Sequence, residues 1–169
     1  MNILTVNLLL STLVFYVAAR IYLWPSLPEL DARRLLVPIL ILHSFRHLGL
    51  MFLSPGATYP GMPPEFANPA AYGDLVAAVL ALAAIAALTA GARIGKALVW
   101  IFNVWGTLDL ATAIVQGTTH NADKFMGAAY WIPTFWVPAL LVTHYVTFVY
   151  LLRYWKQDRW LPSSRSSTI

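Results

Sequence analysis

Five long apolar stretches, separated by short polar or proline-rich segments, dominate the pattern of the chain. Each stretch is close to the roughly 20 residues that an α-helix needs to cross the hydrocarbon core of a bilayer. The pattern therefore predicts an all-α, polytopic membrane helical bundle with five transmembrane helices. The expected spans are 3–24, 35–54, 75–92, 97–117 and 126–152.

The composition supports the same class. Of 169 residues, 59% are hydrophobic and only 11% are charged, whereas a soluble domain is about 25% charged. A soluble enzyme and a nucleic-acid-binding domain are therefore excluded. The absence of cysteine excludes disulfides, thiolate metal ligands and a cysteine nucleophile.

Residues 1–162 are predicted to form a single five-span domain, and the polar segment 163–169 is expected to be a disordered tail. The first apolar stretch is too long for the core of a signal peptide, so it is expected to be a retained span. Between the second and third spans, residues 55–73 hold five of the eleven prolines. Proline interrupts helices, so this segment is expected to be a long irregular loop.

The basic residues predict the orientation. Every Lys and Arg except Arg46 and Lys124 flanks the same ends of the spans. Because basic residues collect in cytoplasmic loops, the N-terminus is expected outside and the C-terminus in the cytoplasm. The residues on the expected cytoplasmic side are Arg20, Arg33, Arg34, Arg93, Lys96, Arg153, Lys156, Arg159 and Arg165.

Ionisable residues inside the spans are the candidate functional groups, because such residues are costly in lipid and usually face the bundle interior. His43, Arg46 and His47 have the spacing i, i+3, i+4, which places them on one side of an α-helix. Asp109 lies in the fourth span and His144 in the fifth. The three helices are therefore expected to bury these side chains against one another.

Depth predicts which of these residues meet. At a rise of about 1.5 Å per residue, His43 and His144 both lie about 14 Å from the cytoplasmic edge, and His47 and Asp109 both lie about 20 Å from it. The expected contacts are therefore His43 with His144 and His47 with Asp109. A polar cavity is expected between the second, fourth and fifth spans, open toward the outer face and covered by the proline-rich loop, with Arg46 and His47 on its wall.

The first functional hypothesis is a site that binds, and could transport or isomerise, a small lipophilic molecule in the membrane. His47 polarised by Asp109 would act as a catalytic acid or base. Membrane lipid and a lipophilic small molecule are the expected partners, with no nucleic acid. The ligand-binding candidates are His43, Arg46, His144, Trp105, Tyr130 and Thr112.

Three alternatives stay open. A b-type haem would take His43 and His144 as axial ligands from two helices. A single metal ion would take its ligands from among His43, His47, His144 and Asp109. The third alternative is an accessory subunit of a larger membrane complex. The expected assembly is such a complex or a homo-oligomer.

Overall fold

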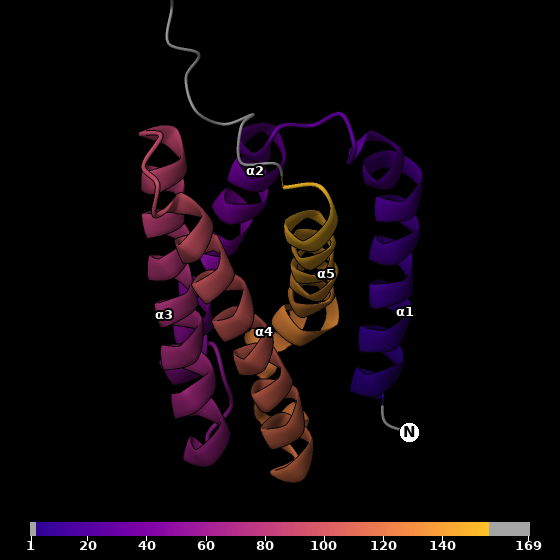
Figure 1. Ribbon diagram of the computed structural model, residues 1–169. Coiled ribbons are helices and arrows are strands. Elements are labelled where there is room, and N and C mark those ends of the chain that lie inside the picture. The colour runs from indigo at the N-terminus through magenta and orange to yellow at the C-terminus, as the bar shows by residue number, and fades with distance from the viewer. Residues whose placement is uncertain (1–2, 156–169) are drawn as a thin grey trace, which may run out of the picture.

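A computed structural model describes residues 3–155, and it confirms the all-α architecture. Five of its helical segments are long and apolar enough to cross a membrane, and they stand side by side (Figure 1). The five α-helices are α1 (Ile3–Ala18), α2 (Ala32–Ser44), α3 (Pro64–Thr89), α4 (Gly95–Thr119) and α5 (Val137–Arg153). The tail 163–169 lies outside the described residues.

Several spans combine α-helix with tighter or wider turns. The first span continues past α1 as a π-turn, Ala19–Leu23, and a 3₁₀ turn, Trp24–Ser26. The second span continues past α2 as η3, a 3₁₀-helix over Phe45–Leu53. The fifth span begins with the 3₁₀ turn Gly127–Tyr130 and the π-segment η6 (Ile132–Trp136). The two prolines of this segment, Pro133 and Pro138, therefore disturb the start of the fifth span, as the sequence predicts.

The predicted loop over residues 55–73 is wrong at its second half, because α3 already begins at Pro64. Proline is favoured in the first helical turn, where its missing N–H has no partner to lose. Pro69 lies inside the same helix and costs one backbone hydrogen bond there. The third span is consequently longer than the predicted 75–92 and includes Asp74.

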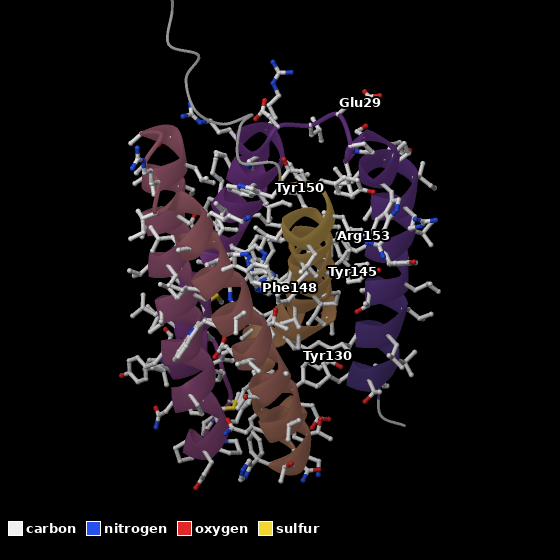
Figure 2. The ribbon with its side chains drawn as sticks, in the orientation of Figure 1. Glu29, Tyr130, Tyr145, Phe148, Tyr150 and Arg153 are labelled. Carbon is white, nitrogen blue, oxygen red and sulfur yellow. The ribbon has the colours of Figure 1, made fainter. Side chains whose placement is uncertain are left out.

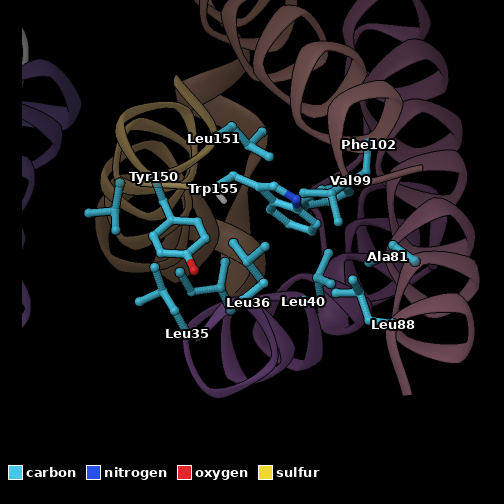
Figure 3. Close-up of a cluster of buried hydrophobic side chains, with 14 of the residues drawn as sticks. Leu35, Leu36, Leu40, Ala81, Leu88, Val99, Phe102, Tyr150, Leu151 and Trp155 are labelled. Carbon is cyan, nitrogen blue, oxygen red and sulfur yellow. The ribbon is translucent and has the colours of Figure 1, made fainter. Parts of the chain in front are cut away.

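Two apolar clusters form the core, one toward each end of the bundle. Figure 3 shows the larger one, in which Leu36 and Leu40 of α2 lie near Val99 of α4 and Tyr150 of α5. The smaller one gathers around Phe52, at the end of η3. Between them lie the buried polar residues of the chain's described part, which are His43, Arg46, Asp74, Asn103, His144 and Thr147.

Helix α1 stands at one edge of the bundle, beside α5 (Figure 1). It packs on α5 and η6, and none of the residues of Ile3–Ala18 is buried. The segments α2, η3 and α4 all pack on α3, and α5 contacts both α4 and α1. The residues of the buried polar layer all come from the second to fifth spans.

The two ends of the bundle differ. We call the end that holds the N-terminus and the start of α3 the N-terminal end. Tyr130 lies toward this end, and the connection between α1 and α2, which includes Glu29, lies at the opposite end (Figure 2).

Candidate functional site

Arg46 is the centre of the buried polar layer. Its side chain has no exposed surface. The Nε atom donates to Asp74 Oδ1 at 2.6 Å, and Nη2 donates to Asp109 Oδ2 at 2.5 Å. One guanidinium from η3 therefore bridges a carboxylate of α3 and a carboxylate of α4. We call these three residues the Arg46 triad.

The remaining guanidinium nitrogen reaches α5. Nη1 of Arg46 donates to the Gly106 carbonyl at 3.1 Å and lies 3.3 Å from Nε2 of His144. An arginine has no acceptor, so Nε2 of His144 must accept. The Nδ1–H of His144 then donates to Asn103 Oδ1 at 2.7 Å. These bonds fix His144 as a neutral imidazole.

His43 is neutral for a similar reason. Its Nε2 lies 2.9 Å from Thr143 Oγ1, whose hydroxyl already donates to the carbonyls of Ala139 and Leu140. The hydroxyl has one proton, so it must accept from Nε2–H of His43. A charged ring would carry a second N–H at Nδ1, where it would be buried without a hydrogen-bond partner, so the neutral ring is favoured.

The predicted contact between His43 and His144 is confirmed, with the two ring centroids 4.3 Å apart. Phe102 packs edge-on against His43 and lies beside His144. Each histidine nitrogen that has a partner bonds to a neighbouring helix or to Arg46. The two rings thus join α2, α4 and α5 at the level of the triad.

The predicted contact between His47 and Asp109 is wrong. His47 is exposed, and its Nδ1 lies 2.9 Å from the carbonyl of Ser44 in the same segment. The cause is the change from α-helix to 3₁₀-helix at Phe45. In a 3₁₀-helix, residues three apart eclipse each other, so Arg46 stays in line with His43 and His47 turns away. The buried positions 43, 46, 49 and 52 follow this spacing.

Three glycines make room for the charged side chains, and each comes from a different helix. A Cβ atom at Gly49 would overlap Asp74, and one at Gly73 would overlap Asp109. A Cβ atom at Gly106 would lie 2.6 Å from His144 and 2.7 Å from Nη1 of Arg46. Side-chain Cβ atoms do not approach this closely, so the site requires glycine at these positions.

The other predicted ligand-binding residues lie outside this network. Trp105 is exposed and its indole Nε1 lies 3.4 Å from the Gly73 carbonyl. Thr112 is exposed and donates to a carbonyl of its own helix, that of Leu108. Tyr130 packs against the smaller apolar cluster. Of the predicted site residues, His43, Arg46, Asp109 and His144 are therefore brought together.

Sequence reasoning missed Asp74, Asn103 and Thr143. Asp74 escaped notice because the prolines placed it at the edge of a predicted loop. The sequence feature that points to Asp74 is its position as an acidic residue directly before the alanine-rich apolar stretch. Asn103 and Thr143 carry no charge, and polar uncharged residues are common in spans.

The geometry does not suit the haem and metal hypotheses. Axial histidines lie on opposite faces of a porphyrin, but the rings of His43 and His144 are in direct contact. Among residues 3–155, no three His, Asp or Glu side chains converge as a metal site requires. The guanidinium of Arg46 occupies the position between the two carboxylates, where a cation would bind.

A separate apolar pocket of about 240 Å³ lies next to the triad, in the N-terminal half of the bundle. Its walls come from α1, η3, α3, α4, η6 and the start of α5, and Asp74 is the one ionisable residue among the described residues that line it. The predicted polar cavity is wrong, because the side chain of Arg46 has no exposed surface and His47 lies on the outside of the bundle. Arg46 does not line the pocket, so the carboxylate of Asp74 is the point where the pocket contacts the hydrogen-bonded network.

The profile of one protein family matches residues 3–152, almost the whole chain, and its description is "Domain of unknown function (DUF8737)". No curated protein and no solved structure matches the chain.

Proposed function

Because the chain belongs to this family of unknown function, DUF8737, its activity must be inferred from its own geometry, and we propose that it binds a small lipophilic molecule within the membrane. The observation that carries the proposal is the apolar pocket with Asp74 in its wall. A well-formed apolar pocket with few polar groups is the usual form of a small-molecule site.

The pocket size suits a small ligand. An apolar cavity of about 150 Å³ accommodates benzene. A pocket of about 240 Å³ therefore suits one ring with a short chain. Asp74 lies ten residues after Pro64 in α3, which corresponds to a depth of about 15 Å at the helical rise. The polar end of the ligand would then lie near the middle of the bilayer.

The hydrogen-bonded network supports binding in a different way. It ties η3, α3, α4 and α5 together on one side of the pocket, and α1, none of whose residues in Ile3–Ala18 is buried, lines the other side. A lipophilic molecule would enter from the bilayer beside this exposed helix. Entry between α1 and α4 is part of the proposal.

Filling the pocket is expected to abolish binding. Ala113 of α4 lines the pocket, whereas Ala111 of the same helix is exposed. With 3-phenylpropanol as the probe and the protein in lipid nanodiscs, A113F is expected to weaken binding at least about tenfold, which is about 1.4 kcal/mol. The matched control A111F is expected to bind as the natural chain does. Equal binding by the two variants would contradict the pocket as the site.

We also propose the orientation with the N-terminus outside, because the basic residues gather at the end opposite the N-terminus. Cysteine labelling tests it directly, since the chain has none of its own. S54C lies in the connection before α3, and A90C lies at the end of α3. An impermeant maleimide added to intact cells is expected to label S54C only. Labelling of A90C alone would reverse the assigned orientation.

A further inference from the structure

The charges around the pocket do not balance, and this identifies the chemistry of the ligand. Arg46 supplies one positive charge, and Asp74 and Asp109 supply two negative charges when ionised. The hydrogen bonds of His144 and the buried, unpartnered Nδ1 of His43 favour the neutral form of both rings. With both carboxylates ionised, the network therefore carries one negative charge in excess, and an uncompensated charge is costly inside a membrane.

Asp74 is the carboxylate that can be compensated from the pocket. It lines the pocket, whereas Asp109 does not, and its Oδ1 already accepts from Arg46. The other described pocket residues are apolar, apart from glycine and the hydroxyl-bearing Thr5 and Thr118. An anionic ligand would meet Asp74 in the pocket wall, and none of the described pocket residues is basic. A cationic ligand would find its counter-charge there.

From this arrangement, and resting on the proposed function, we infer that the ligand is a lipophilic amine whose ammonium group binds Asp74 while its apolar part fills the pocket. An ammonium group offers three donors, which suits a carboxylate that keeps lone pairs beyond its bond to Arg46. Phospholipid amines are disfavoured as the source, since Asp74 lies about 15 Å from the start of α3, well below the headgroups.

A series of probes that share one carbon skeleton and differ in their polar group tests which ligand charge the site prefers. The probes are 3-phenylpropylamine, 3-phenylpropanol and 3-phenylpropionate, measured with the full chain in nanodiscs of zwitterionic lipid. The amine is expected to bind at least about tenfold more tightly than the alcohol, and the carboxylate is expected to bind most weakly. Equal affinity for amine and alcohol would overturn the inference, and it would show that a proton already compensates the extra carboxylate.

Variants of the carboxylates test which of them recognises the ammonium group. D74N should remove the preference for the amine over the alcohol, because it removes the carboxylate in the pocket wall. D109N leaves Arg46 and Asp74 as a balanced pair, so it should weaken the preference as well. D31N, which changes a carboxylate at the start of α2 outside the pocket, should keep it. Circular dichroism and size-exclusion chromatography report whether each variant folds. If neither D74N nor D109N folds, the wild-type probe series still decides.

The two proposals fail in different ways. If A113F leaves the binding of all three probes unchanged, the pocket is not the site and the proposed function fails. If A113F blocks binding but the alcohol binds as tightly as the amine, the pocket stands and the cationic ligand is wrong. A preference for the amine that D74N retains would also contradict the role of Asp74. Selective binding of phosphatidylethanolamine vesicles over phosphatidylcholine vesicles would identify a lipid amine instead and overturn a free amine.

Discussion

Replacing Arg46 with methionine is expected to lower the free energy of unfolding by about 3–5 kcal/mol, the cost of breaking a buried ion pair from one side. The substitution removes the guanidinium that Asp74 and Asp109 share. The two carboxylates would then face each other without a counter-charge between helices α3 and α4. Reversible unfolding in mixed micelles, followed by circular dichroism, measures the loss.

Arg34 provides the matched control. It lies at the start of α2, pairs with Asp31, and its side chain is 79% exposed. The effect of R34M is expected to be about 0–1 kcal/mol, as for other exposed ion pairs. Equal losses for R46M and R34M would contradict the triad.

A triple variant separates the lost charge from the lost packing. In R46M/D74N/D109N the two neutral amides need no counter-charge, so much of the stability lost in R46M should return. If the triple variant is less stable than R46M, the carboxylates are not the source of the cost.

Introducing one methyl group at Gly106 is also expected to destabilise the bundle. In G106A the new Cβ would lie 2.6 Å from His144 and 2.7 Å from Nη1 of Arg46. Overpacking of this kind costs about 1–3 kcal/mol, although alanine favours a helix by about 1 kcal/mol over glycine. The same unfolding measurement is expected to show a net loss.

Gly117 of the same helix is the control for G106A. A Cβ atom there would lie 3.3 Å from the ring of Phe66, a contact that a small ring shift relieves. G117A should therefore retain the helix-propensity gain and lose little. A loss in G117A equal to that in G106A would show that alanine is unfavourable anywhere along α4, and not specifically beside the triad.

The fold could be predicted because bilayer thickness fixes the length of each apolar stretch. The same hydrophobic pattern does not distinguish an α-helix from a 3₁₀-helix. The wrong position of His47 follows from this, since Phe45 begins a 3₁₀ segment that turns His47 away from Asp109. Arg46 and Asp109 were found as candidates because charges in spans are rare, but which carboxylates meet the arginine depends on helix packing.

The beginning of α3 shows a second limit. The prolines indicate a loop, whereas Pro64 takes the position in the first helical turn that proline favours. Asp74 was therefore left out of the membrane, and the excess carboxylate could not be recognised. The apolar pocket was equally hidden, because its walls come from residues far apart in the chain that only tertiary packing brings together.

Photolabelling tests the pocket most directly. A derivative of 3-phenylpropylamine that carries a diazirine on its ring would be bound to the protein in nanodiscs, and the complex would be irradiated. Mass spectrometry would then identify the labelled peptides. The account predicts labels concentrated on the pocket segments 4–8 and 113–118, and their loss in A113F. Labels spread over exposed, lipid-facing positions such as Leu108 and Leu152, with the same yield in A113F, would contradict it.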